Sequence, residues 1–495
     1  MTTGRKSRRL SFQRAVLDET RALWMHVDMH RFVNGLIFGL LLAALVAAVN
    51  FQHTWPGAEQ AIGHSLLILA LCTICSIYLV TFESRRIRAF RAIGSVGILS
   101  IIPIAAAVWL PDFGLPVHVN PVVMVAFIFG IVYSERTAVM LSLMLCVLVG
   151  LSLQITHPRQ LGAMPYDLAV ILFAGATVAA LGCGKIRKRS KLLKLGLLSA
   201  VVQVALIAAA ALRAGGPLDY RDAIFGFTNG IVWAVLVTAL LPLIEQIFKV
   251  ATGISLLELS DQSHPLLRQL SLEAPGTYHH SLILGNLAES AGEAIGINSL
   301  MLRVGAYYHD VGKLAKPEYF VENEEMQGSM HSNLSPTMSA LIITAHTKDG
   351  AQLARDKGLP EPIVDLIQQH HGTSLVEFFY HRAKELNGTQ VDPELFRHPG
   401  PKPQTKEAGV LLLVDSVESA SRALPEPTPS RIARQVHDVI NRKLMDGQLD
   451  ECELTLTDVH KIEQNLIRSL TSVFHGRIKY PEPDEPITGR DQNGR

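Results

Sequence analysis

Histidine and aspartate residues recur at wide intervals in the second half of the chain, and these residue types supply nitrogen and carboxylate ligands to divalent metal ions. The set comprises His280, His309, Asp310, His346, His370, His371 and Asp415. Such a set is too large for one tetrahedral ion and suits two ions with about four to six ligands each. The pattern therefore predicts a two-metal centre assembled from several helices.

The residues around this set define conditions that the centre must meet. Neighbouring helical residues point about 100° apart, so His309 and Asp310 reach one centre only where a helix end faces it. Asp415 follows the apolar run 410–414, and a carboxylate in a buried helix is costly unless it is paired or bound to a metal. A His-Asp dipeptide alone is common by chance, and His346 alone would be an ordinary helix residue. These residues become candidate metal ligands only because they occur together with the rest of the set.

The second half is predicted to be helical. From 253 to about 478, apolar residues recur at the helical period between turn signals, and strand-like alternation is scarce. The polar stretch 316–334 is expected as a loop beside the site, and the proline-rich segment 399–403 as another loop. The tail from 481 is expected to be disordered.

Local signals predict where the site helices begin and end. Thr277 is expected to cap the helix that carries His280, and Ser335, followed by proline, the helix that carries His346. Gly372 is expected to end the helix of the His-His pair.

The first half has a different character. The chain has 495 residues and is 48% hydrophobic but only 18% charged, less charge than a soluble enzyme of this size usually carries. A membrane-spanning helix needs about 20 apolar residues. Eight candidate spans are 32–50, 63–82, 92–110, 118–133, 137–155, 167–183, 194–213 and 223–247, of which the fourth is short.

Lysine and arginine are distributed unevenly between the loops. They gather in the N-terminal tail and in the second, fourth and sixth loops, while the alternate loops hold few or none. The positive-inside rule therefore places the N-terminus and, after eight spans, the second half in the cytoplasm. The span middles contain almost no ionisable residues, which disfavours a proton-coupled transporter.

Cysteines and net charge indicate no further chemistry. Cys72 and Cys75 form a CxxC within an apolar run without a second pair, so packing explains them better than a redox or zinc site. The net charge of +1 gives no support for nucleic-acid binding.

Longer stretches around the His/Asp set resemble a known family. They are 264–270 (HPLLRQL), 274–281 (APGTYHHS), 303–310 (RVGAYYHD), 370–373 (HHGT) and 399–407 (PGPKPQTKE). Together with the pattern H…HD…H…HH…D of the HD superfamily of metal-dependent phosphohydrolases, they resemble the seven-transmembrane receptors with an intracellular HD hydrolase domain. The motifs cover 253–480, whereas the membrane half is similar by architecture more than by motif.

The resemblance implies a phosphodiesterase that hydrolyses cyclic di-AMP to pApA with a hydroxide bridging two metal ions, iron or manganese. The first ion would be held by His280, His309, Asp310 and Asp415. Asp310 would bridge to a second ion held by His346 and His370, with His371 either a ligand or directly behind one. One departure is the short loop 51–62, where family members usually carry a large extracellular domain.

Further residues are assigned from their chemistry and their position relative to the His/Asp set. Asp310 and Lys313 would be catalytic, with Lys313, one turn after Asp310, contacting phosphate. The alternative for Lys313 is a solvated surface lysine. Thr373 and Arg422 are candidate substrate contacts. His279 is expected to be structural, and packing or solvent-exposed roles are expected for His264, His331, His381, His398 and His475.

We therefore expect an all-α protein. Its parts would be a basic cytoplasmic tail (1–31), a transmembrane bundle of about eight helices (32–247), a linker helix (248–274), an HD phosphohydrolase domain (275–480) and a disordered tail (481–495). The expected setting is a bacterial inner membrane with the N-terminus and HD domain cytoplasmic. The expected partners are the lipid bilayer and a cyclic dinucleotide but no nucleic acid polymer, and a homodimer stays open.

Two alternatives remain at this point. One is an HD hydrolase of another nucleotide, such as cyclic di-GMP or a guanosine polyphosphate. The other is a receptor that binds a nucleotide without cleaving it, which the complete ligand set disfavours. The base of the substrate and the choice between iron and manganese do not follow from the sequence.

Overall fold

The structure of the chain is a computed structural model that describes residues 29–50, 58–82, 90–157, 165–184, 186–323, 330–388 and 391–475. Within these ranges the regular elements are α-helices and short 3-10 helices without a β-strand, and Leu375 and Arg397 form an isolated bridge. The predicted all-α fold is confirmed. The tail expected from 481, and most of the expected N-terminal tail, lie outside the described residues. The chain divides into two compact units between Ile254 and Ser255.

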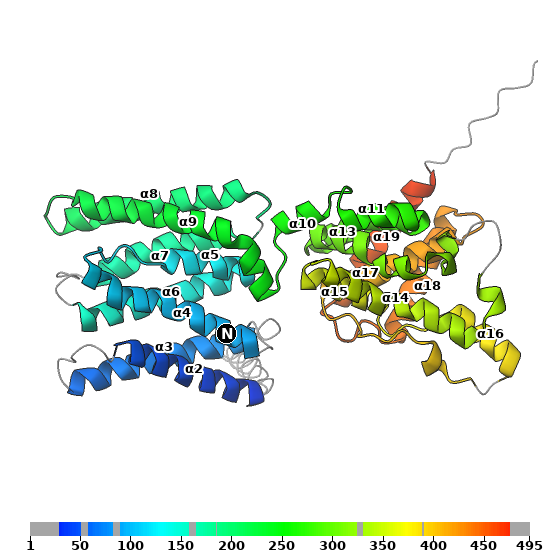
Figure 1. Cartoon of the computed structure of the whole chain (residues 1–495), viewed down its shortest axis with the longest axis horizontal. Helices are drawn as coiled ribbons and strands as arrows, with labels where there is room; N and C mark the ends of the chain where they lie inside the picture. The colour runs from blue at the N-terminus through cyan, green and yellow to red at the C-terminus, as the bar shows by residue number, and fades with distance from the viewer. Residues whose placement is uncertain are drawn as a thin grey trace, which may run out of the picture. The chain divides into compact units, whose positions relative to one another are not determined.

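The first unit is an apolar helix bundle. Its described helices are α2 (Met29–Asn50), α3 (Ala58–Phe82), α4 (Phe90–Trp109), α5 (Val122–Val132), α6 (Glu135–Thr156), α7 (Pro165–Gly182), α8 (Arg189–Arg213) and α9 (Tyr220–Phe248). Figure 1 shows α2 beside α3 and α8 beside α9, with α4 to α7 between these pairs. Five helices in the described part of the chain are long and apolar enough to cross a bilayer. Large apolar side chains such as Ile62, Ile98 and Val201 are exposed on the bundle, as a lipid-facing surface requires.

The helix α5 differs from the predicted fourth span. It has 11 residues, so it is about 16 Å long, half the roughly 30 Å of the hydrocarbon layer. Its side chains from Val122 to Gly130 are buried, and α6, α7 and α9 pack around it. Within the segment 118–133, α5 is therefore a short helix in the core of the bundle. By its length alone it is too short to cross the hydrocarbon layer.

A chain of buried polar side chains joins α7, α8 and α9. Ser199 donates to the carbonyl of Gly175 at 3.0 Å, and Gln203 donates to Ser199 Oγ at 3.2 Å. Asn229 donates to Gln203 Oε1 at 3.0 Å and accepts from the indole of Trp233 at 2.6 Å. Such hydrogen bonds link helices inside an apolar bundle, where an unpaired polar group is costly.

The second unit contains the predicted site. Its helices are α10 (Gly253–Leu259), α11 (Pro265–Glu273), α12 (Pro275–Ile295), α13 (Ser299–Tyr308), α14 (Pro336–Asp356), α15 (Glu361–Gln369), α16 (Glu377–Asn387), α17 (Lys406–Arg422), α18 (Pro429–Met445) and α19 (Leu456–His475). Short 3-10 helices are η2 (Val311–Ala315), η3 (Pro317–Tyr319), η4 (Val321–Asn323), η5 (Met330–Asn333) and η6 (Pro393–Phe396). The segment 248–274 holds α10 and α11, with a turn between them, instead of one linker helix. α12 packs against α13, α17 and α19, and α14 packs against α15 and η2.

The predicted helix ends are partly confirmed. The Ser335 hydroxyl accepts from a first-turn backbone N–H of α14, as predicted. The prediction for Thr277 is wrong because α12 already begins at Pro275, which puts Thr277 inside the first turn. α15 ends at Gln369, earlier than predicted, while Gly372 adopts a left-handed φ of 54° just beyond it.

Candidate metal centre

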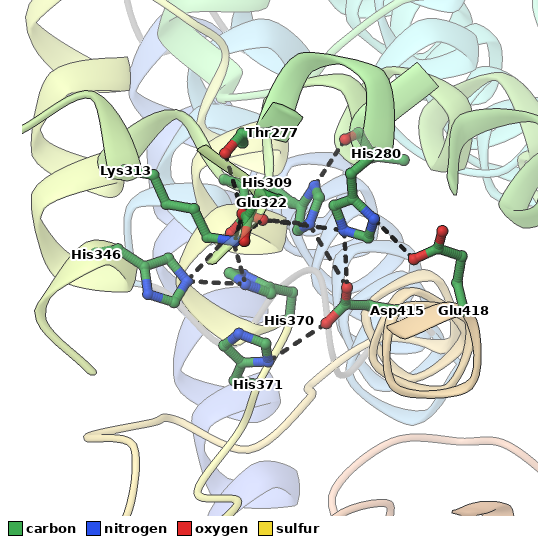
Figure 2. Close-up of polar contacts among 12 residues, drawn as sticks. Thr277, His280, His309, Lys313, Glu322, His346, His370, His371, Asp415 and Glu418 are labelled. Atoms are coloured by element: carbon green, nitrogen blue, oxygen red, sulfur yellow. Dashed lines mark hydrogen bonds and ion pairs between the residues drawn. The ribbon is translucent and has the colours of Figure 1, made fainter. Parts of the chain in front are cut away.

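The predicted His/Asp residues meet in one buried centre, although 135 positions separate His280 from Asp415. Figure 2 shows the side chains of the five histidines and Asp415 pointing toward one another. α12 supplies His280, the junction of α13 and η2 supplies His309 and Asp310, and α14 supplies His346. The residues after α15 supply His370 and His371, and α17 supplies Asp415. All are buried except His371, which is partly exposed.

The centre lies at a helix end, as the His-Asp dipeptide requires. α13 ends at Tyr308, His309 occupies its C-cap, and Asp310 is the N-cap residue before the tighter η2. This change of helix type lets both side chains reach the centre, with His309 Nε2 3.1 Å from Asp310 Oδ2.

A close backbone approach fixes Asp310 beside His346. A Cβ atom at Gly312 would lie 1.9 Å from the His346 carbonyl oxygen and 2.5 Å from the Gly350 nitrogen. Only glycine allows η2 to approach α14 this closely. The contact holds Asp310 Oδ1 3.2 Å from His346 Nε2.

The histidine rings are oriented by backbone carbonyls. Nδ1 of His309, His346 and His370 lies 2.7, 2.5 and 2.7 Å from the carbonyl oxygen three residues earlier. Because a carbonyl only accepts, each Nδ1 carries the proton and each Nε2 presents its lone pair. All three lone pairs are turned into the centre.

This arrangement fits cations. His346 Nε2 and His370 Nε2 lie 3.2 Å apart, yet with both Nδ1 atoms protonated neither nitrogen has a proton to donate. His309 Nε2 and Asp310 Oδ1 are buried without a hydrogen-bond partner. Lone pairs and carboxylate oxygens that converge without donors are costly to bury unless a cation satisfies them.

Three overlapping triads offer ligand atoms within 4.8 Å of one another. They are His280/His309/Asp415, His309/Asp310/His370 and His346/His370/His371. His309 and His370 are shared between triads, so the geometry suits two neighbouring ions better than two isolated ones.

Glu418 supports the centre and was not predicted. Its Oε2 lies 2.8 Å from His280 Nδ1 and 2.7 Å from Arg422 Nη2. Arg422 Nη2 also lies 2.6 Å from His280 Nδ1, but a guanidinium only donates, so the hydrogen bond of Nδ1 is the one to the carboxylate. His280 thereby presents Nε2 to Asp415 Oδ1 at 3.1 Å. A glutamate one turn after Asp415 in a buried helix was the available signal.

The protonation states of three ligands match those needed for metal binding. The fourth, His280, differs: burial lowers its pKa, but hydrogen bonds to Asp415 and Glu418 outweigh this and raise it to about 9, so metal binding there releases a proton. Burial raises the pKa of the Asp310 and Asp415 carboxyl groups, but the neighbouring histidines, together with Lys313 beside Asp310, outweigh it and lower both. Burial lowers the pKa of His370 to about 3. The carboxylates are therefore anionic and His370 neutral near neutral pH.

The remaining predicted residues lie at the edge of the centre. Lys313 is only slightly exposed and lies against Asp310 rather than in solvent, with Nζ 2.7 Å from Asp310 Oδ2. Thr373 is held by the side chain of Gln448, which accepts from its backbone N–H at 2.8 Å. Arg422 is half exposed and pairs with Glu418. None of these contacts shows substrate binding, which stays a prediction.

Other histidines have structural surroundings. His398 is buried with its ring 4.3 Å from the ring of His371 and 6.0 Å from that of His346. It therefore packs directly against the centre. His279, next to His280, is exposed, and its ring lies 6.0 Å from that of Tyr278.

An all-helical unit with this His/Asp constellation is an HD domain, and the HD-domain family matches residues 277–420. Such a domain binds divalent metal ions. The family described as "7TM receptor with intracellular HD hydrolase" matches residues 32–252. The chain therefore belongs to the 7TM receptors with an intracellular HD hydrolase domain.

Two similar proteins carry the name cyclic-di-AMP phosphodiesterase. The cyclic-di-AMP phosphodiesterase PgpH of Bacillus subtilis is 39% identical over 75% of this chain and 52% of its own length. PgpH of Listeria monocytogenes is 43% identical over 52% of this chain and 36% of its own length. The chain thus spans about half or less of these relatives. A crystal structure of the L. monocytogenes PgpH HD domain with cyclic-di-AMP is 46% identical, with a TM-score of 0.42, and covers 44% of this chain and 100% of its own.

Proposed function

We propose that the chain is a membrane-anchored phosphodiesterase that hydrolyses cyclic di-AMP to pApA. The observation that carries the proposal is the convergence of Nε2 lone pairs and anionic carboxylates on one buried centre, where His309 Nε2 and Asp310 Oδ1 have no hydrogen-bond partner. The substrate class is supported by the two relatives named cyclic-di-AMP phosphodiesterases.

The reaction adds one water to one phosphodiester link. The bond between phosphorus and the ribose 3′ oxygen breaks, which leaves a 5′-phosphate and a 3′ hydroxyl. Two divalent cations held by the His/Asp set would acidify the water and neutralise charge on the phosphoryl oxygens. Asp310 belongs to the triad that shares His309 with one neighbouring triad and His370 with the other, so it would be within reach of both cations. Lys313 would contribute a positive charge next to Asp310.

The ligand types favour iron or manganese. Imidazole and carboxylate suit these ions, and no cysteine belongs to the triads of the described chain. We therefore propose a di-iron or di-manganese centre.

A cytoplasmic location of the HD domain is supported by α8 and α9. These two helices form an antiparallel pair, so the loop before α8 and the end of α9 lie at the same end of the bundle. A Cβ at Gly253 would lie 2.5 Å from the Ile186 carbonyl oxygen, which agrees with this placement. The loop carries Lys185, Arg187 and Lys188, and such loops face the cytoplasm. The inference does not depend on whether α5 crosses the membrane.

The test is a substrate panel on the full chain in detergent, loaded with Mn²⁺ or Fe²⁺, with bound metal measured in parallel. We expect linearisation of cyclic di-AMP and slower turnover of cyclic di-GMP and guanosine polyphosphates. Preference for another nucleotide would reassign the substrate, and bound metal with bound nucleotide but no turnover would indicate a receptor.

The matched variant is Asp310→Asn, which keeps the shape of the side chain and removes its charge. We expect it to fold and to lose at least about a thousandfold in kcat, because a shared metal ligand is worth several kcal/mol. Retained turnover in a folded variant would contradict the mechanism.

A further inference from the structure

A lysine on α18 lies behind the centre, outside the predicted set. Lys443 Nζ donates to Ser374 Oγ at 2.8 Å. Ser374 is buried, and its carbonyl accepts from the backbone N–H of His398 at 3.0 Å. The His398 ring in turn packs on His371 at 4.3 Å. Lys443 therefore belongs to the wall that the loops after α15 and η6 build beside the centre.

The charge of Lys443 is not neutralised within the described part of the chain. Its hydrogen-bond partner there is the neutral hydroxyl of Ser374. The nearby carboxylates are engaged elsewhere, Asp446 with Arg397 at 2.9 Å and Glu377 with Arg442 at 3.2 Å. By contrast, Lys313 is held by two carboxylates.

The surroundings of Lys443 favour the binding of an anion. Burial lowers the pKa of Lys443, and the negative charge of Asp415 opposes this, which places the ammonium within electrostatic reach of the centre. A partly buried ammonium without a carboxylate is costly, and an anionic ligand removes that cost.

We propose that Lys443 binds the phosphate of the cyclic dinucleotide that is not being cleaved. This inference rests on the proposed function. A cyclic dinucleotide carries two phosphodiester groups, and only one can occupy the His/Asp centre. The second needs a cation near the centre but separate from it, and Lys443, one layer behind His371 and His398, meets that description. It would be a substrate-binding residue that selects two-phosphate substrates.

The test compares two substrates on the full chain in detergent with Mn²⁺. Cyclic di-AMP has two phosphates, whereas bis(p-nitrophenyl) phosphate has one and reports the metal centre alone. For Lys443→Gln we expect KM for cyclic di-AMP to rise about tenfold to hundredfold, the worth of a hydrogen bond to a charged group. The kinetics of the one-phosphate ester and the bound metal stay unchanged. Lys443→Arg should restore most of the affinity, and Lys461→Gln, an exposed lysine on α19, should change neither substrate.

The outcomes separate the two proposals. An equal loss on both substrates, or an unchanged KM for cyclic di-AMP, overturns the role of Lys443. Wild-type protein that cleaves the one-phosphate ester but no cyclic dinucleotide overturns the proposed function instead. If Lys443→Gln does not fold, amine acetylation of the metal-free wild-type chain decides the question. Cyclic di-AMP, but not adenosine, should then protect Lys443 from the reagent, and equal labelling overturns the proposal.

Discussion

The ammonium nitrogen of Lys313 lies 2.5 Å from Oε1 of Glu322, while its other carboxylate partner is Asp310. Burial lowers the pKa of Lys313, but these two carboxylates outweigh it and raise the pKa. Lys313 therefore stays charged, and a phosphate that binds it competes with these two carboxylates for the positive charge. Because Asp310 belongs to the centre, Glu322 is the partner that phosphate would displace.

The first prediction follows from this exchange. Glu322→Gln keeps an acceptor for the Thr277 hydroxyl, which donates to Oε1 at 3.0 Å, but removes the competing charge. We expect inorganic phosphate to inhibit the variant about tenfold more strongly, since a charge-assisted hydrogen bond no longer competes. Inhibition constants measured on metal-loaded protein check this. Glu318→Gln, exposed on η3, is the control, and an unchanged or higher inhibition constant would refute the exchange.

A second prediction concerns Glu418, whose carboxylate fixes the proton of His280 on Nδ1. Glu418→Gln weakens that hydrogen bond, and partners of metal-binding histidines are worth about tenfold to hundredfold in metal affinity. We expect at least a tenfold weaker apparent metal affinity, with turnover recovered at excess Mn²⁺. Metal titration of the apo protein measures it. Glu385→Gln, exposed on α16, should titrate like the wild type, and turnover lost even at saturating metal would show a different role.

Stability should depend on pH through His264, which caps α11. Its Nδ1 accepts from the Leu266 N–H at 3.4 Å, and its ring lies 5.5 Å from that of Tyr308. Burial lowers the pKa of His264 below its ordinary value of 6.5, while Asp261 opposes this. The unfolded chain therefore binds more protons below pH 6.5, so stability falls as the pH drops from 6.5 toward the folded-state pKa.

The measurement is the unfolding midpoint between pH 7.5 and 5. His264→Asn keeps a capping acceptor that does not titrate, so its midpoint should fall less steeply with acid than that of the wild type. His381→Asn, at an exposed position on α16, should leave the wild-type slope unchanged. Identical slopes in all three proteins would exclude His264 as a contributor.

The polar chain through α7, α8 and α9 should stabilise the bundle. Asn229→Leu leaves Gln203 Oε1 and the Trp233 indole without their hydrogen bonds, and such contacts in membrane bundles are worth about 0.6 to 1.7 kcal/mol. We expect a destabilisation of this size in detergent unfolding. Thr228 is exposed on the same helix, and Thr228→Ala should lower the free energy of unfolding by less. A more stable Asn229→Leu variant would mean that the polar chain serves another purpose.

The sequence predicted the centre well because its residue types are rare together and their chemistry is demanding. The condition that a helix must end at His309 and Asp310 is met by α13. The sequence did not predict Glu322 or Glu418 as partners, because their roles depend on contacts with Lys313, Thr277 and His280 that sequence spacing does not reveal.

The local errors have physical reasons as well. Thr277 has the right chemistry for a cap, but Pro275 takes the first helical position and moves the helix start upstream. In the bundle, the span over 118–133 stays a prediction, but the helix there is shorter than the apolar run. Asn120 accepts from the Val122 N–H and donates to the Pro103 carbonyl. This contact ends the loop and shortens the helix, and it depends on a neighbour that hydropathy does not register.

The 135 positions between His280 and Asp415 also bear on how the protein is made. During synthesis the α12 histidine leaves the ribosome long before α17. The centre is therefore incomplete until α17 has been translated and supplies Asp415. Asp310 and His346 come from η2 and α14, which precede α17 in the chain and pack closely together at Gly312. Metal capture is then a late step in maturation, after the apolar bundle that precedes it in the chain has been translated.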